Sequence, residues 1–258
     1  MRPNRQTKTN QFQPLEAYRT ELFATPFWKL RFNYNLDEIV RDVRKAVSVV
    51  EKQSGGDTKR NYTTYFDRDI HDEYIGGTPW CKQLTTNLKD TYVDIMHKEF
   101  LKDPREQNML RSNIHCCLWV NRYTDQHEHS VHNHKGTILS GTFYVKTSQP
   151  CAPIIFESPN EYANMLFMTE DRHHQGDNGQ DNHFGVPAVQ KEFQFQPRDG
   201  DIALWPSYLY HHVPPQHHQE ERISISFNLA HSVMYGPSTT DKLLDECDYS
   251  FLTQEECQ

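Results

Sequence analysis

The chain has 258 residues and a formal net charge of −8 at pH 7, from 35 acidic and 27 basic side chains. A pI near 6.0 disfavours nucleic acid or an anionic membrane as a partner held by bulk electrostatics. A mean hydropathy of −0.85 and the lack of a long apolar run exclude a transmembrane helix, so we expect no nucleic-acid and no membrane partner.

The cysteines and the N-terminal segment bear on the cellular compartment. Six cysteines without a CxxC pair do not make a disulfide framework in a chain of this length. The first residues are polar and carry no hydrophobic signal core. Both features favour reduced thiols in a cytoplasmic protein, and the length suits one large domain with an ample core.

The N-terminal part of the chain is predicted to hold one strand and two helices. The strand is expected within Leu22–Asn33, where Pro26 interrupts an apolar run. Apolar residues then recur at helical spacing over 36–51, with Asn35 as the cap, and again over about 80–101.

From Ile114 onward the residue pattern changes to short apolar runs, read as strands, separated by turn residues. Many short strands after helices predict a mainly β fold, a jelly roll with helical support on one side. The expected strands are Cys116–Asn121, Ile138–Lys146, Ile154–Glu157, Phe193–Phe195, Ile202–Trp205 and Ile223–Leu229.

These elements divide the chain into four expected segments. They are a disordered lead-in at 1–14, an N-terminal strand with helical support at 15–112, a β core at 113–235, and an acidic C-terminal tail at 236–258. Within the core, the acidic, amide-rich and His-rich segment 160–183 is predicted to be a long loop. We expect this loop to influence substrate selectivity.

Two histidines one residue apart, His132 and His134, are expected on a strand just before a Lys-Gly turn. Residues i and i+2 of a strand point to the same side, so the two imidazoles can chelate one metal ion. Imidazole binds Fe, Zn, Cu and Ni alike, and the pair therefore does not identify its metal. The other interpretation is a solvated His-rich loop, because further histidines precede the pair.

A second histidine pair, His211 and His212, comes directly before two prolines that fix the backbone. A rigid loop is a good platform for a metal ligand. We take His211 as that ligand, with His212 facing the other way. The alternative is a Tyr- and Pro-rich turn whose histidines face solvent.

The strand expected at 223–229 alternates apolar and polar residues, so Arg222 and Ser224 share one face. A guanidinium pairs with a carboxylate through two parallel hydrogen bonds, and a serine hydroxyl can add a third. Such polar faces either meet solvent, the usual case, or line a ligand cavity inside a small barrel. Arg222 lies eleven positions after His211, and this combination suggests an oxygen-activating iron enzyme that uses 2-oxoglutarate.

Several strings over about residues 114–230 resemble the 2-oxoglutarate/iron(II) oxygenases common in phages and marine microbes. They are Trp119-Val120-Asn121, His132-Asn133-His134, Leu139 to Val145, Gly200-Asp201 through Pro206-Ser207 to His211, and Arg222 to Asn228. The resemblance implies a double-stranded β-helix, a cupin-like jelly roll, as the catalytic core at 113–235. It also implies Fe(II) held by His132 and His211.

The same resemblance implies 2-oxoglutarate as co-substrate, with Arg222 and Ser224 on its distal carboxylate and Tyr144 or Asn121 assisting. No residue beyond the metal ligands is then expected to be catalytic. Such an enzyme hydroxylates an unactivated C–H bond and releases succinate and CO2, with ascorbate as an assisting reductant. The implied substrate is a protein side chain, such as proline, or a small metabolite.

One position departs from the usual pattern. Iron oxygenases normally bind the metal with two histidines and a carboxylate in an HxD or HxE string, whereas this chain has His134 at that position. Either His134 is the third ligand, which we favour, or a carboxylate such as Glu128 or Glu157 supplies it.

Two other functions remain open from the sequence. A three-histidine iron dioxygenase would use His132, His134 and His211 without 2-oxoglutarate and would not depend on Arg222. A non-catalytic jelly-roll module would hold zinc in a closed, four-coordinate site, or no metal at all.

Overall fold

The computed structural model describes residues 24–53, 61–99, 110, 113–123, 128–147, 151–159, 192–215 and 220–231. The predicted lead-in at 1–14, the loop at 160–183 and the tail at 236–258 lie outside these residues. Among the described helices, none is both long and apolar enough to cross a membrane.

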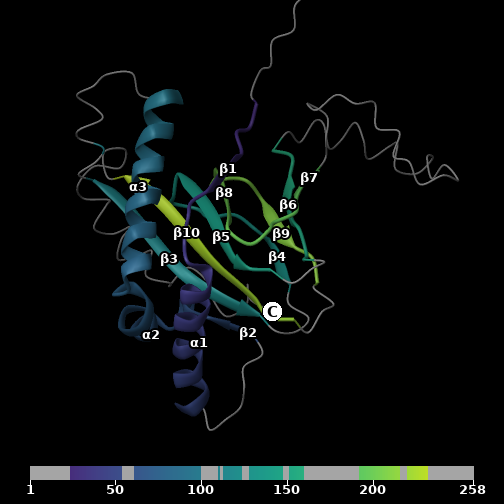
Figure 1. The fold of residues 1–258 in the computed structure, drawn as a ribbon. Coiled ribbons are helices and arrows are strands. Elements are labelled where there is room, and N and C mark those ends of the chain that lie inside the picture. The colour runs from purple at the N-terminus through teal and green to yellow at the C-terminus, as the bar shows by residue number, and fades with distance from the viewer. Residues whose placement is uncertain are drawn as a thin grey trace, which may run out of the picture.

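The described strands form two antiparallel sheets that face each other (Figure 1). The large sheet has the order β1-β8-β5-β10-β3-β2, and the small sheet has the order β4-β9-β6-β7. The strands are β1 (Trp28–Arg31), β2 (Asn61–Thr63), β3 (Ile114–Tyr123), β4 (His129–His132), β5 (Leu139–Lys146), β6 (Ile154–Glu157), β7 (Glu192–Phe195), β8 (Asp201–Pro206), β9 (His211–Val213) and β10 (Arg222–His231).

The eight strands from β3 to β10 make a double-stranded β-helix. The chain passes between the sheets at almost every connection, so that β3, β5, β8 and β10 lie in the large sheet and β4, β6, β7 and β9 in the small one. An antiparallel chain wound over two facing sheets in this way is a jelly roll. The predicted mainly β class with flanking helices is confirmed.

The two long helices begin at residues that cap them. At α1 (Leu36–Gln53), the backbone N–H of Glu38 donates to Asn35 Oδ1 at 3.3 Å, as the predicted cap requires. At α3 (Pro79–Glu99), the backbone N–H of Cys81 donates to Thr78 Oγ1 at 3.3 Å, and Pro79 occupies the first helical position, where its missing N–H costs nothing.

Between α1 and α3 lie short elements that the sequence did not reveal. These are β2, η1 (Thr64–Phe66), α2 (Arg68–His71) and η2 (Asp72–Gly76). Segments of three to five residues are too short to show a period, which is the main signal of secondary structure in a sequence. The same reason hid β9 and left the bounds of β4 undetermined, although a strand had been expected at His132.

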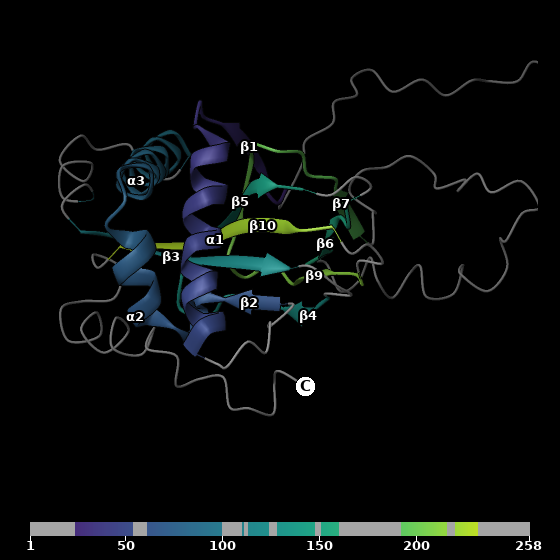
Figure 2. The same ribbon diagram turned by 60° about the horizontal axis from the view of Figure 1, so that its bottom comes forward.

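Two separate apolar clusters hold the layers together. The outer cluster packs α1 and α3 against the large sheet, with Ile39 and Leu84 among its fully buried members. Figure 2 shows the helices on one side of the large sheet and the small sheet on the other. The inner cluster fills the space between the sheets and contains Tyr144, Ala152, Ile154, Phe156, Phe195, Ala203, Trp205, Leu209 and Val213.

Successive side chains of β10 point to opposite sides of the large sheet. Ile223, Ile225, Phe227 and Leu229 belong to the outer cluster, so the polar residues between them point into the barrel. Arg222 and Ser224 are accordingly only 5% and 4% exposed. Of the two positions considered for this polar face, the structure shows the interior of the barrel and not solvent.

Candidate metal centre

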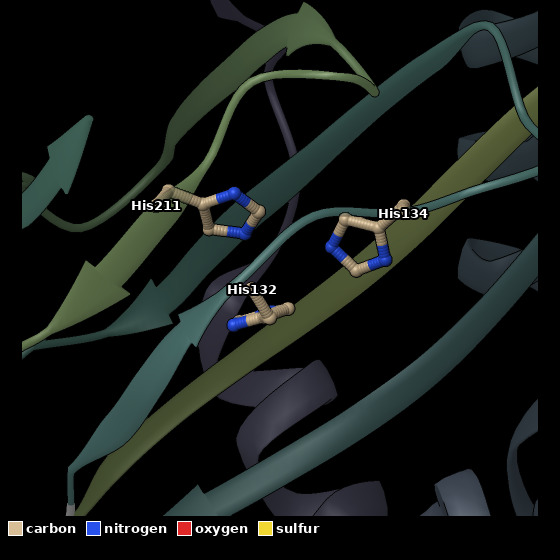
Figure 3. A group of neighbouring side chains, drawn as sticks. All are labelled: His132, His134 and His211. Atoms are coloured by element: carbon tan, nitrogen blue, oxygen red, sulfur yellow. The ribbon is translucent and has the colours of Figure 1, made fainter. Parts of the chain in front are cut away.

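Three histidines, two on neighbouring strands and one just beyond a strand, converge at one end of the barrel. His132 ends β4 and His211 begins β9, and the two residues face each other in the register of that strand pair. His134 follows β4 by two residues. Potential ligand atoms of all three side chains lie within 4.8 Å of one another, and Figure 3 shows the three rings around a common space.

A turn, and a clasp made by two backbone hydrogen bonds between 134–138 and Ser207, position His134. Strand alternation does not. The prediction that both members of the pair lie on one strand is wrong, because β4 ends at His132. Gly136 has a φ of +80°, which glycine adopts readily, and it lets the chain turn back. The His134 N–H donates to Ser207 O and the Ser207 N–H donates to Ile138 O, both at 3.0 Å.

The Ser207 side chain strengthens this clasp. Its hydroxyl accepts a hydrogen bond from Thr137 Oγ1 at 2.8 Å and lies 2.7 Å from Ser140 Oγ. Ser207 is 1% exposed, so these bonds are sheltered from water. The loop that carries His134 is therefore fixed to the end of β8, a structural role of Ser207 that the sequence motif did not predict.

His211 also differs from its predicted setting. It was expected in a Pro-bounded loop, and the structure places it at the start of β9, with Pro214 just beyond the end of that strand. His211 is buried and its neighbour His212 is half-buried. A strand holds the His211 ring more firmly than a loop does.

Backbone carbonyls set the tautomers of two of the rings. His132 Nδ1 lies 2.7 Å from Ser130 O, and His211 Nδ1 lies 3.0 Å from Leu209 O. A carbonyl oxygen only accepts, so each Nδ1 carries the proton and each Nε2 keeps a free lone pair. Metal-ligating histidines commonly have their second ring nitrogen held in this manner.

The environment also keeps the three rings neutral, the form that binds metals. Burial lowers the pKa of His132. Burial, followed by repulsion from neighbouring imidazolium charge, places the pKa of His134 well below 6.5 and lowers that of His211 to about 3.

Neither alternative carboxylate joins this group. Glu128 is exposed just before β4, and Glu157 ends β6 with its backbone N–H bonded to Tyr210 O. The group consists of His132, His134 and His211 alone among the described residues. The donor set in the described part of the chain is therefore three neutral nitrogens.

Arg222 is a buried charge without a charged partner in the part of the chain that the structure describes. Its Nη1 donates to Ala152 O at 3.4 Å and its Cζ lies 5.5 Å from the centre of the Tyr144 ring. Within the described residues, its Nε has no hydrogen-bond partner and no carboxylate pairs with it. A buried guanidinium in this condition is unfavourable, and an anionic ligand between the sheets would satisfy it.

The remaining predicted site residues line the same inner wall. Ser224 pairs with Asn121 on one side and with Tyr144 on the other, and all three side chains are buried. Asn121 Nδ2 donates to Ser226 Oγ at 3.0 Å. Burial raises the pKa of Tyr144, so its hydroxyl remains protonated and can donate.

The aromatic surroundings of the metal group were not predicted from the sequence. The Trp205 and Phe156 rings lie 5.0 and 5.7 Å from the His211 ring, and Trp119 lies 6.0 Å from His134. The alternation within β8 could have placed Trp205 inside, because Ile202 and Leu204 lie on its opposite face. That inference required knowing which face of the strand points into the barrel.

Residues 117–228 match the protein-family model described as "Putative 2OG-Fe(II) oxygenase". The matched segment extends from β3 into β10 and contains all seven residues predicted for the metal and the co-substrate. No curated protein matches the chain.

Three solved structures illustrate what the chain is similar to. A Pseudomonas putida prolyl-4-hydroxylase has a TM-score of 0.47 and 12% identity, covering 80% of this chain and 93% of that one. AviO1 from Streptomyces viridochromogenes has a TM-score of 0.48 and 13% identity, with 81% and 91% covered. HygX from Streptomyces hygroscopicus, with nickel and 2-oxoglutarate bound, has a TM-score of 0.44 and 14% identity, with 81% and 84% covered. The fold itself is assigned from the strand order given above.

Proposed function

Because residues 117–228 match the model of the 2-oxoglutarate/Fe(II) oxygenase family, we propose that the chain is an oxygenase of this family, that His132, His134 and His211 hold its Fe(II), and that Arg222 binds its 2-oxoglutarate. Fe(II) and 2-oxoglutarate are the cofactors of this family. When bound, they would activate O2, so that one oxygen atom converts a C–H bond to C–OH and the other enters succinate as 2-oxoglutarate loses CO2. The proposed substrate is a protein side chain, such as proline, or a small metabolite.

The observation that carries the proposal is the placement, inside one barrel, of a neutral three-imidazole group and a buried arginine that has no carboxylate partner among the described residues. A metal cation needs the first, and a dicarboxylate needs the second. Each feature alone has a structural explanation. Together they suit two ligands of opposite charge, a divalent metal ion and the oxo acid that chelates it.

The chain's own residues contribute binding, orientation and exclusion of water. Arg222 would grip a carboxylate with its fork of N–H donors, and the Ser224 and Tyr144 hydroxyls would donate from adjacent strands. The carbonyls of Ser130 and Leu209 hold the His132 and His211 rings in orientation. The aromatic side chains of the inner cluster keep water from the space between the sheets.

A row of aromatic rings supports a substrate with an apolar surface. It runs from Phe66, which is 64% exposed, through Tyr65 and Trp119 to His134, with ring centres 5.0, 5.2 and 6.0 Å apart. Aromatic side chains contribute large contact areas in binding sites. We propose that this row guides the substrate toward the metal.

An anaerobic titration of the metal-free protein with Fe(II), and then with 2-oxoglutarate, tests the proposal. We expect a saturable visible charge-transfer band that forms only when both are present. His211→Ala should abolish the band by removing a ligand, whereas His97→Ala, a change at an exposed position of α3, should leave it intact.

Arg222→Lys separates co-substrate binding from metal binding. Lysine keeps the charge but loses the two-pronged geometry, so Fe(II) affinity should stay the same while 2-oxoglutarate binds at least about tenfold more weakly. Equal affinity for 2-oxoglutarate in this variant would remove Arg222 from the site.

The all-histidine donor set also favours a second candidate, an iron dioxygenase that does not use 2-oxoglutarate. Iron bound by wild-type protein without any band on addition of 2-oxoglutarate would support that candidate. Turnover of a thiol or small-ring substrate that is indifferent to Arg222→Lys would distinguish it further.

A further inference from the structure

Trp205 lies inside the barrel, at the metal end. It belongs to β8, where Ile202 and Leu204 face the helices and Ala203 and Trp205 face the inner cluster. The residue is 1% exposed. Its indole ring is therefore enclosed between the two sheets.

The indole N–H of Trp205 has no acceptor among the described residues. Two other tryptophans show the usual arrangement, since Trp28 Nε1 donates to Glu99 Oε1 at 3.2 Å and Trp80 Nε1 donates to Asp42 Oδ2 at 2.9 Å. A buried donor without a partner costs free energy and is rare in native proteins. A missing ligand is one of the recognised explanations for such a group.

The surroundings of Trp205 identify where that ligand would lie. Its ring centre is 5.0 Å from that of His211 and 5.0 Å from that of Phe156, in edge-on arrangements. The Phe156 ring is itself 5.7 Å from His211. The indole that carries the unpartnered donor therefore lies beside a proposed metal ligand, in the cluster that also contains Tyr144, the ring next to Arg222.

We propose that the Trp205 indole N–H donates a hydrogen bond to an oxygen atom bound to the metal, either a carboxylate oxygen of 2-oxoglutarate or a water. The proposal rests on the proposed function of the site. Trp205 would then help to place the co-substrate at the metal, while Arg222 grips its other end. An anionic oxygen is the stronger acceptor, which favours 2-oxoglutarate over water.

NMR of the indole groups tests this without any turnover. The protein has four tryptophans, so indole-¹⁵N labelling gives four N–H signals that single Trp→Phe variants assign. Zn(II) would replace Fe(II) as an unreactive, diamagnetic metal. We expect the Trp205 signal to shift downfield, and its exchange with solvent to slow, when 2-oxoglutarate joins the Zn(II) protein, while the Trp28 and Trp80 signals stay in place.

The separate additions distinguish the two acceptors. A full shift with Zn(II) alone would identify metal-bound water as the partner. A shift that appears only with 2-oxoglutarate would identify the co-substrate. If the signal moves with neither, although both ligands are bound, the inference is wrong.

Trp205→Phe keeps an aromatic ring but removes the donor. We expect its dissociation constant for 2-oxoglutarate, measured on the Zn(II) protein, to rise about tenfold, while its Zn(II) affinity stays within twofold. Trp28→Phe, which removes an indole N–H bonded elsewhere, should change neither constant. Unchanged 2-oxoglutarate binding in Trp205→Phe, together with a Trp205 signal that does not shift on addition of Zn(II) alone, would overturn the inference.

The failure of this inference differs from failure of the proposed function. If wild-type protein binds Zn(II) and 2-oxoglutarate but neither the Trp205 signal nor the affinity of Trp205→Phe changes, only the role proposed for Trp205 is wrong. If wild-type protein binds no 2-oxoglutarate in the presence of metal, the proposed function falls, and with it the basis of the inference.

Discussion

His134 is the residue at which this chain departs most from the usual iron site. A carboxylate at this position would carry a negative charge, whereas the imidazole is neutral, so a divalent metal here keeps its full positive charge. The clasp between 134–138 and Ser207 holds the residue against the group. The structure therefore presents His134 as a fixed part of the cluster.

Two substitutions at this position should show whether the His134 imidazole itself contributes to metal binding. His134→Ala should weaken Fe(II) or Zn(II) binding at least about tenfold, because one of three ligands is lost. His134→Asp should retain metal binding within about tenfold of wild type, since it restores the usual donor set. Competition with a chromogenic chelator measures both affinities, and wild-type affinity in His134→Ala would exclude this residue as a ligand.

At the residue scale, the sequence pattern identified the candidate site residues but not the side chains that surround them. His132, His211 and Arg222 were selected by spacing, and the structure gathers them inside the barrel. Their roles as ligands and anchor remain predictions. Trp205 escaped notice because alternation tells which residues share a face, but only the packed structure tells which face is inside.

At the element scale, Glu221 ties three elements to the start of β10. It accepts hydrogen bonds from Arg44 of α1, from Arg122 of β3 at 2.9 Å and from Lys146 of β5 at 3.1 Å. Burial by itself raises the pKa of Glu221, but the bonds from these three cations outweigh it and lower the pKa to about 2.

Acid should therefore weaken the fold through this residue. A pKa that is lower in the folded state than in the unfolded state, about 4.3, gives stability that is complete above pH 4.3 and is lost as the pH falls toward 2. Glu221→Gln should reduce the free energy of unfolding at pH 7 by about 1–3 kcal/mol. Urea unfolding from pH 7 to pH 3 should show a smaller pH dependence in this variant, and an identical dependence would contradict the assignment.

Gly141 permits the close packing of β5 between β8 and β10. A Cβ atom at this position would lie 2.5 Å from Ala203 O and would collide with the Phe227 ring. Neither the neighbouring backbone nor the buried ring can move aside cheaply, because both lie in the centre of the large sheet.

Gly141→Ala should accordingly lower the free energy of unfolding by about 2 kcal/mol or more. Gly77→Ala is its matched control, because no atom lies within 4 Å of the added methyl group and the backbone φ of −77° suits any residue. The control should change stability by no more than about 0.5 kcal/mol. Equal unfolding midpoints for the two variants would show that β5 packs less tightly than the structure indicates.

The strength of the local pattern decided whether the sequence revealed an element. The helices at 36–53 and 79–99 and the strands at 139–146 and 222–231 were predicted within a few residues, because each shows several periods of its pattern. The four-residue strand at 154–157 was predicted as a short apolar run between turn residues. The strands β4 and β9 have four and three residues, and they are the ones that carry His132 and His211. Their pairing depends on contacts distant in sequence, which no local pattern expresses.

At the scale of the whole molecule, the proposed ligands would join the two sheets. The metal group lies at the small sheet, through β4 and β9, whereas Arg222 belongs to β10 of the large sheet. Ligands that bind across both sheets in the folded protein, and not in the unfolded chain, must stabilise it as a whole.

Addition of Zn(II) and 2-oxoglutarate should therefore raise the midpoint of thermal unfolding. At ligand concentrations one hundred times the dissociation constant, binding adds about 2.7 kcal/mol, which corresponds to a rise of several degrees. Differential scanning fluorimetry measures the shift. His211→Ala should show no rise, and an equal rise in that variant would mean that the ligands bind elsewhere.

The class of fold, with helices on one side of a jelly roll, followed from the change of residue pattern near residue 114. The strand order could not be obtained in this way, since it depends on which strands cross from one sheet to the other. The predicted segments at 1–14, 160–183 and 236–258 lie outside the described residues, so they remain predictions.

The two apolar clusters have a consequence for how such a protein can change over generations. Each long strand of the large sheet presents one face to the helices and the other to the space between the sheets. A substitution at an inward position can therefore change the lining of the site while the helix-facing side chains keep their own packing. New substrate preferences can arise on this scaffold by point mutation without first weakening the part that folds it.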